Sequence, residues 1–315
     1  MTDIIFEYNE PFYILVDDNC DGERVDKYLS DMLSSFSRSQ LQKLIKDEKV
    51  LVGRDDKNLK AVKANYKLTK GECICITIPE PEELNIVPED IPLDIIYEDD
   101  SLIVVNKPKG MVVHPAPGHY TGTLVNALMY HCKDNLSGIN GVLRPGIVHR
   151  IDMDTTGVLV VCKNDFAHQS LSEQLKVHSI TRRYEAICHG TFKEKTGTVD
   201  APLGRCPNDR LKMAIVKDGK NAVTHYEVLQ NFEKFSYISC VLETGRTHQI
   251  RVHMSSLGHP LLGDELYCNQ KSPFKLQGQT LHARILGFRH PVTNEYKEFE
   301  APLPDYFKML LDKLK

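Results

Sequence analysis

An acidic segment rich in proline limits how these 315 residues can fold. Residues 79–100 carry nine Asp or Glu side chains and no Lys or Arg. The prolines of this segment are Pro79, Pro81, Pro88 and Pro92. Proline lacks an amide hydrogen, so the segment can continue neither a helix nor a central strand, and its like charges repel one another. We therefore predict an acidic linker over residues 79–92, between a domain at 13–78 and a larger domain at 93–315.

The stretch before the linker is basic. Between Arg38 and Lys70 there are ten Lys or Arg side chains and four acids. The net charge of −4 would by itself argue against an anionic partner, but the charges are segregated along the chain. A run of lysines is most often a solvated surface, and the alternative is a surface that follows the phosphates of a nucleic acid.

The pattern Arg38-Ser39-x-Leu41-x-x-x-Ile45 precedes Val50-Leu51-Val52. The spacing of its apolar residues predicts a short helix followed by a strand. This pattern resembles the S4 RNA-binding module, a small unit of two helices and strands. The resemblance implies RNA contacts from Arg38, Lys43 and Lys46 that contribute affinity but little sequence information.

In the second domain, a polar loop runs directly into an apolar strand. The loop is Gly146-Ile147-Val148-His149-Arg150-Ile151-Asp152-Met153-Asp154-Thr155-Thr156-Gly157, and the strand is Val158 to Cys162. Asp152 therefore lies where the strand begins. A carboxylate in this position either shapes a turn by bonding its own backbone or works as an acid, base or nucleophile.

The loop resembles the signature of the RluA/RluD family of pseudouridine synthases, usually His-Arg-Leu-Asp, two residues, then Thr-Ser/Thr-Gly. Ile151 stands here for Leu and Thr156 for Ser. Three further blocks occur in the family's order and spacing: Asn106-Lys107-Pro108-Lys109-Gly110 with Val113-His114-Pro115, then Arg183-Tyr184, then Thr244-Gly245-Arg246-Thr247-His248-Gln249-Ile250-Arg251-Val252-His253. The resemblance covers the chain from about residue 13 to its end.

The resemblance assigns roles to individual residues. It implies that Asp152 is the catalytic carboxylate, that Tyr184 stacks on the uracil ring, and that Arg251 pairs with the aspartate. It also implies a substrate-binding set of His149, Arg150, Lys107 and Ile250, in which His149 and Arg150 fill the space left by a flipped base or hold its phosphate. Without the resemblance, Tyr184 would be read as a core residue and Arg251 as a surface residue.

The fold that the resemblance implies is mixed α+β. A small S4-type domain of helices and strands would precede a catalytic domain with a largely antiparallel central sheet and flanking helices. The strand-like and helix-like runs of the sequence allow this architecture without requiring it.

Pseudouridine formation breaks the bond between N1 and the ribose and rejoins the base through C5. The reaction consumes neither electrons nor phosphate energy, so we expect no cofactor and no metal. The sequence contains no G-x-G-x-x-G, no phosphate-binding P-loop and no zinc-type ligand cluster. Nine scattered cysteines without a C-x-x-C pair indicate reduced thiols, and we expect a cytoplasmic monomer with no membrane span.

Two other function classes remain open at this point. A non-catalytic RNA-binding or ribosome-assembly factor would need only the basic N-terminal domain. A metal-dependent hydrolase would use His149, Asp152 and Asp154. Within the isomerase class, large-subunit (23S) ribosomal RNA is our first substrate and transfer RNA the alternative.

Overall fold

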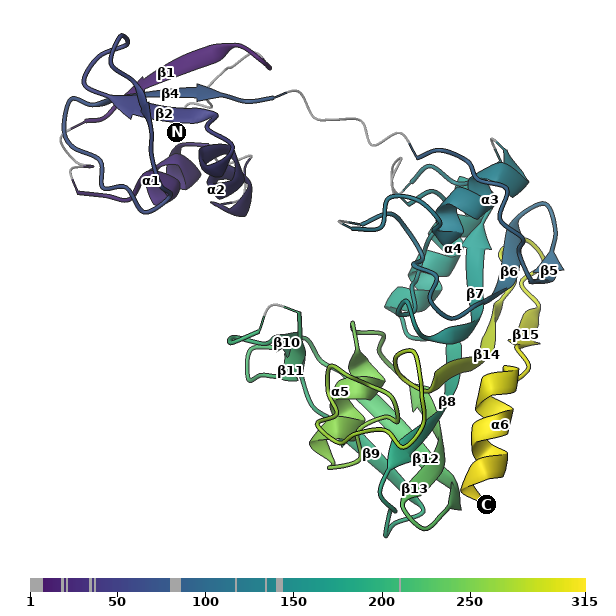
Figure 1. Cartoon of the computed structure of the whole chain (residues 1–315). Coiled ribbons are helices and arrows are strands. Elements are labelled where there is room, and N and C mark those ends of the chain that lie inside the picture. Colours follow the sequence, from purple (N-terminus) through teal and green to yellow (C-terminus); the bar gives the residue numbers. More distant parts are fainter. Residues whose placement is uncertain are drawn as a thin grey trace. The chain divides into compact units, whose positions relative to one another are not determined.

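The computed structural model describes residues 8–17, 20, 22–33, 36, 38–79, 86–116, 118–133, 135–139, 144–209 and 211–315. The chain forms two compact units, residues 1–83 and 84–315 (Figure 1). Each unit has its own hydrophobic core, so each is described by itself. No helix in the described ranges is long and apolar enough to cross a membrane.

The first unit packs two helices against an antiparallel sheet. The helices are α1 (Val25–Met32) and α2 (Arg38–Lys46). The strands, in the sheet order β1-β4-β2-β3, are β1 (Pro11–Leu15), β4 (Cys73–Thr77), β2 (Val50–Gly53) and β3 (Lys60–Ala61). Leu29 and Leu41 are fully buried against Ile74 and Ile76 of β4. The apolar spacing that predicted α2 therefore marks its buried face.

The second part of the predicted linker is not a free linker. Ile86 is buried and belongs to the core of the second unit. The side-chain amide of Asn126 donates to the carbonyl oxygen of Val87 at 2.8 Å, and the amide of Glu89 donates to the carbonyl oxygen of Asn126 at 3.0 Å. Residues 86–92 thus pack on the second unit, and our prediction of a linker up to residue 92 extends too far. One buried isoleucine and one buried asparagine outweigh the charge pattern on which the prediction was based.

The second unit is built on a nine-stranded sheet. Its strand order is β5-β6-β7-β14-β8-β13-β12-β9, with β15 paired to β14. The strands are β5 (Ile95–Glu98), β6 (Leu102–Lys107), β7 (Thr156–Cys162), β8 (Thr181–His189), β9 (Thr196–Asp200), β12 (Val223–Asn231), β13 (Phe235–Leu242), β14 (Leu281–Arg289) and β15 (Tyr296–Glu300). Every neighbouring pair is antiparallel except β7 with β14. This confirms the mixed α+β fold with a largely antiparallel sheet.

Helices and a small hairpin surround the large sheet. The helices are α3 (Leu124–Cys132), α4 (Asp165–Lys176), α5 (Gln249–Ser256) and α6 (Asp305–Leu314), and the hairpin pairs β10 (Leu203–Arg205) with β11 (Met213–Ile215). Helix α4 packs on β7, and α5 packs on β12 and β11. Phe307 of α6 is fully buried beside Tyr237 of β13.

The parallel contact between β7 and β14 places the predicted catalytic loop over the middle of the sheet. All seven residues of β7 are buried, and Gly157 is paired with Ala283. Gly157 has a φ of 111°, and a Cβ added there would lie 2.2 Å from the carbonyl oxygen of Ala283. Only glycine permits this close approach, because it has no side chain and tolerates positive φ.

Candidate functional site

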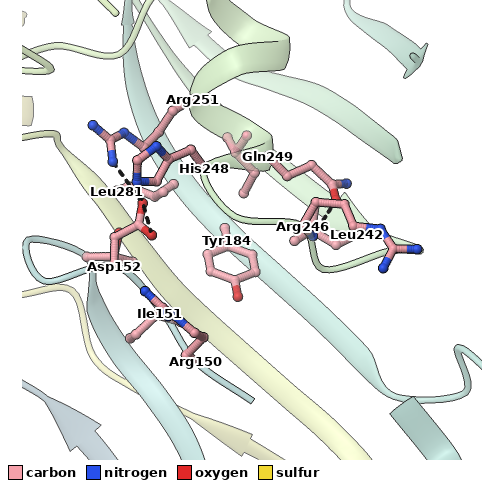
Figure 2. Close-up of a pocket in the computed structure, with 12 residues that line it drawn as sticks. Arg150, Ile151, Asp152, Tyr184, Leu242, Arg246, His248, Gln249, Arg251 and Leu281 are labelled. Carbon is pink, nitrogen blue, oxygen red and sulfur yellow. Dashed lines mark hydrogen bonds and ion pairs between the residues drawn. The ribbon is translucent and has the colours of Figure 1, made fainter. Parts of the chain in front are cut away.

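A pocket of about 340 Å³ opens where three separate segments of the second unit meet (Figure 2). The loop before β7 contributes Arg150 to Asp152 and Thr155, and the central strands contribute Tyr184, Leu242 and Leu281. The third segment, which enters α5, contributes Arg246 and His248 to Arg251. Asp152, Tyr184 and Arg251, which are far apart in the sequence, thus line one pocket, as the resemblance implied.

Arg251 lies between two carboxylates. Its Nη1 donates to Oδ2 of Asp152 at 3.0 Å, and its Nε and Nη2 donate to Asp264 at 2.7 and 2.9 Å. Asp264 is buried, and the side chain of Asp152 is 19% exposed. The fork to Asp264 fixes the plane of the guanidinium, so that its remaining edge faces Asp152. Arg251 therefore orients the carboxylate of Asp152, and Asp264 in turn orients Arg251.

Burial disfavours the charged form of Arg251, but the hydrogen bonds and charges of Asp264 and Asp152 outweigh this effect. Together they raise the pKa of Arg251 above its ordinary value. The site consequently keeps a permanent positive charge next to Asp152 although water is largely excluded.

Tyr184 supplies a flat apolar surface. It lies in β8, opposite Cys240 of β13 and Ala283 of β14, and only 8% of it is exposed. Figure 2 shows its ring directed into the space beside Asp152. Burial raises the pKa of Tyr184, so its hydroxyl is protonated at neutral pH. An aromatic ring in this position can stack on a flat heterocycle.

Two of the predicted substrate-binding residues also line the pocket. Ile250 is buried, and Arg150 is exposed. An exposed arginine beside a pocket can reach a phosphate or a base outside it, whereas Ile250 can only offer an apolar contact.

Lys107 does not line the pocket, and our prediction that it contacts RNA is wrong. The residue is 1% exposed, and its ammonium donates to the carbonyl oxygens of Pro108, Met111 and Met153 at 2.8, 2.8 and 2.9 Å. All three donors of the ammonium are used, so none remains for a phosphate. Lys107 instead ties the end of β6 to the residue that follows Asp152.

His149 is not among the residues that line the pocket, and its contact with the substrate stays a prediction. Its Nε2 accepts the amide hydrogen of Val160 in β7 at 3.1 Å. Burial, with a contribution from Arg182, lowers the pKa of His149 to about 3, so the ring is neutral. A neutral imidazole bonded to the core strand supports the loop and cannot bind a phosphate by charge.

The predicted RNA contacts of the first unit lie on α2. Lys43 and Lys46 are exposed in its last turn. Arg38 donates from Nε and Nη2 to Asp26 at 3.1 and 3.0 Å, and Arg24 donates to the same buried carboxylate. Half of the side chain of Arg38 stays accessible, at 46% exposed. These residues belong to a different unit from the pocket.

Sequence reasoning missed three residues of the site. Asp264, His248 and Tyr267 were given no role from the sequence. The ring of Tyr267 lies under the guanidinium of Arg251 at 5.1 Å, and Nε2 of His248 is 3.9 Å from Oδ1 of Asp152. Two features of the sequence could have indicated them: the block Gly263-Asp264-Glu265-Leu266-Tyr267, and the position of His248 three residues before Arg251. Among the described residues, no three His, Cys, Asp or Glu side chains are grouped so that they could hold a metal ion.

Comparisons with known proteins agree with this geometry. Residues 101–256 match the family described as RNA pseudouridylate synthase. The chain is 54% identical over 294 residues to the uncharacterized RNA pseudouridine synthase YlyB of Bacillus subtilis, covering 93% of this chain and 95% of the relative. It is 48% identical over 302 residues to ribosomal large subunit pseudouridine synthase D of Zymomonas mobilis, covering 93% and 94%.

A solved structure shares the fold. Human RNA pseudouridylate synthase domain containing 1 superposes with a TM-score of 0.56 at 25% identity, covering 75% of this chain and 97% of the human one. Sequence relatives, fold and pocket point in the same direction: the chain belongs to the RluA/RluD family of RNA pseudouridine synthases, isomerases that convert uridine in RNA to pseudouridine.

Proposed function

We propose that this enzyme isomerises specific uridines of large-subunit ribosomal RNA, with Asp152 as its essential carboxylate. The observation that carries the proposal is the contact of Asp152 with Arg251 inside a pocket lined by Tyr184. Arg251 offsets the cost of holding an ionised carboxylate away from water. Tyr184 provides the surface on which the released ring stays stacked while it rotates.

The target uridine must leave its RNA context to reach the pocket. Flipping a base costs a few kcal/mol and costs least for nucleotides in loops. Arg150 is exposed at the pocket and is the side chain that we assign to the vacated space or to the phosphate of the flipped nucleotide. Ile250 provides an apolar contact for the uracil ring inside the pocket.

The names of the relatives support ribosomal RNA as the substrate. Proteins 48% and 45% identical to this chain are named ribosomal large subunit pseudouridine synthase D. We assign the first unit, over residues 13–78, to an S4-like RNA-binding domain in which Arg38, Lys43 and Lys46 contact phosphates. The enzyme then works as a cytoplasmic monomer without cofactor or metal.

The test is a pseudouridine map of total RNA from cells that lack the gene, complemented with the wild type or with Asp152→Asn. This substitution keeps the size of the side chain and removes its charge. We expect particular ribosomal uridines to lose the modification and only the wild type to restore it. Purified Asp152→Asn should form pseudouridine at least ~10³-fold more slowly than the wild type.

The same map distinguishes the alternatives. Loss confined to transfer RNA would replace the proposed substrate. Full restoration by Asp152→Asn would refute the catalytic role of the carboxylate and favour an RNA-binding or assembly factor. Loss of purified activity on chelation, reversed by a divalent metal, would favour a metal-dependent reaction.

A further inference from the structure

The second oxygen of Asp152 faces a histidine. Arg251 binds Oδ2, whereas Oδ1 points to Nε2 of His248 at 3.9 Å (Figure 2). His248 immediately precedes α5 and has a positive φ of 56°. Its side chain is 18% exposed and lines the pocket. The distance exceeds that of a hydrogen bond, and a shift of about 1 Å would make one.

The backbone around His248 is fixed by the neighbouring side chain. Oε1 of Gln249 accepts hydrogen bonds from the hydroxyl of Thr244 and the amide of Arg246 at 2.8 and 2.9 Å. Nε2 of Gln249 donates to the carbonyl oxygen of Val223 at 2.9 Å. Gln249 is buried, so these bonds hold the turn in which His248 adopts its left-handed conformation.

The hydroxyl of Tyr267 lies at hydrogen-bond distance from Nδ1 of His248. The hydroxyl oxygen accepts the amide hydrogen of Met213 at 2.8 Å, and it lies 2.8 Å from Nδ1 of His248. The hydroxyl hydrogen is thus available for Nδ1. An imidazole that accepts at Nδ1 and is neutral carries its hydrogen on Nε2, the nitrogen that faces Asp152.

The surrounding charges are compatible with a neutral ring. Burial lowers the pKa of His248, and Arg251 and Arg150 act in the same direction. Asp152 and Asp264 oppose them. The net direction is downward, so the ring is uncharged at neutral pH.

We propose that His248 is a positioning residue, which presents Nε2–H to Oδ1 of Asp152 while Arg251 holds Oδ2. The proposal rests on the proposed function, because it concerns how the carboxylate is oriented toward the target nucleotide. Tyr267 supports both partners of Asp152, since its hydroxyl orients His248 and its ring packs on Arg251. With donors on both oxygens, the carboxylate cannot rotate away from the ring stacked on Tyr184.

The kinetic test compares His248→Ala, His248→Gln and Tyr267→Phe in single-turnover pseudouridine formation on ribosomal RNA. His178→Ala is the matched control, because His178 is exposed at the end of α4 and has the same left-handed backbone with a φ of 57°. Thermal melting of each variant shows that it is folded.

We expect His248→Ala to lower the rate constant by about 100-fold, the cost of a misplaced reacting group, with the RNA affinity unchanged. His248→Gln should recover most of the rate, because its amide can place an N–H near the position of Nε2. Tyr267→Phe should fall between them, and His178→Ala should match the wild type. A wild-type rate for His248→Ala, a loss confined to affinity, or a His248→Gln variant as slow as His248→Ala would each overturn the proposal.

A second measurement needs no RNA. Nitrogen NMR of ¹⁵N-histidine-labelled protein, assigned with the His248→Gln variant, reports the tautomer directly. We expect the Nε2–H form in the wild type and a mixture in Tyr267→Phe. A protonated ring or the Nδ1–H form would overturn the proposal even if the enzyme is active. If instead the wild type modifies no RNA while the Nε2–H form is observed, the proposed function fails and the orientation of His248 stands.

Discussion

His149 bonds through a nitrogen that must stay unprotonated. Its Nε2 accepts the amide hydrogen of Val160, and protonation of that nitrogen would break the bond to a fully buried strand. Burial lowers the pKa of His149 to about 3, whereas an unfolded histidine titrates near 6.5. Between these two pH values the unfolded chain binds more protons than the folded one, so the free energy of unfolding falls as the pH falls.

The stability of the protein should therefore depend on pH through His149. Replacement of His149 by Gln keeps an acceptor near Val160 but removes the titrating group. Between pH 6.5 and pH 5 the wild type should lose about 1.6 kcal/mol more of its free energy of unfolding than His149→Gln, because the unfolded histidine is half protonated at pH 6.5 and the slope then approaches about 1.4 kcal/mol per pH unit. Urea denaturation followed by circular dichroism at both pH values measures the difference. His178→Gln, at an exposed histidine, should behave like the wild type. Equal pH slopes for wild type and His149→Gln would contradict the prediction.

Among the elements, the strand pair β7 and β14 positions the loop that contains Asp152. These strands are parallel neighbours in an otherwise antiparallel sheet, and the loop that holds Asp152 leads directly into β7. Lys107 at the end of β6 binds the carbonyl oxygen of Met153 and so fixes the same loop from the other side. The position of Asp152 therefore depends on how closely β7 and β14 approach.

Gly157 sets this approach, and Gly157→Ala should disturb it. The added methyl group would meet the backbone of Ala283 and require an unfavourable positive φ. We expect a loss of about 2 to 5 kcal/mol in the free energy of unfolding, from strain and overpacking together. Gly138→Ala is the control, because a Cβ there meets nothing within 4 Å, and it should change stability by less than about 0.5 kcal/mol. Similar melting temperatures for Gly157→Ala and Gly138→Ala would contradict the prediction, because they would show that β7 and β14 can move apart without loss of stability.

Across the whole chain, the sign of the local charge differs from the net charge. The net charge is −4, yet α2 ends in two exposed lysines, Lys43 and Lys46. Phosphate contacts release counterions, so they contribute affinity that depends on salt rather than on sequence. The pocket with Asp152 lies in the other unit, so the RNA contacts that we propose for α2 would be separate from the chemical step.

The combined Lys43→Gln and Lys46→Gln variant should weaken RNA binding and leave the chemical step intact. We expect the slope of log affinity against log salt to fall in magnitude by about 1.5, and the single-turnover rate at saturating RNA to stay at the wild-type value. Filter binding at several salt concentrations measures the slope. Replacement of Lys308 and Lys313 on α6 by Gln removes the same charge and should leave the slope unchanged. An unchanged slope in the α2 variant would exclude these lysines from the RNA contact.

Local sequence patterns were sufficient to predict α2, β7 and the family. Apolar spacing marked α2 and the buried strand β7, and the four blocks of the resemblance named Asp152, Tyr184 and Arg251, which do line one pocket. These features follow from residues close together in the chain, where side-chain periodicity reports directly which face is buried.

The partners of buried polar groups depended on the folded chain. Lys107 and His149 looked like ligands for RNA in the sequence. In the folded chain the ammonium of Lys107 donates to three backbone carbonyls, and Nε2 of His149 accepts from Val160. Asp264 was given no role from the sequence, yet it fixes Arg251, which binds Asp152 from 99 positions away. A buried donor or acceptor must be satisfied by whatever group the fold brings near it, and such groups come from distant parts of the chain. Periodicity and motif spacing carry no information about that choice, so only the packed sheet settles it.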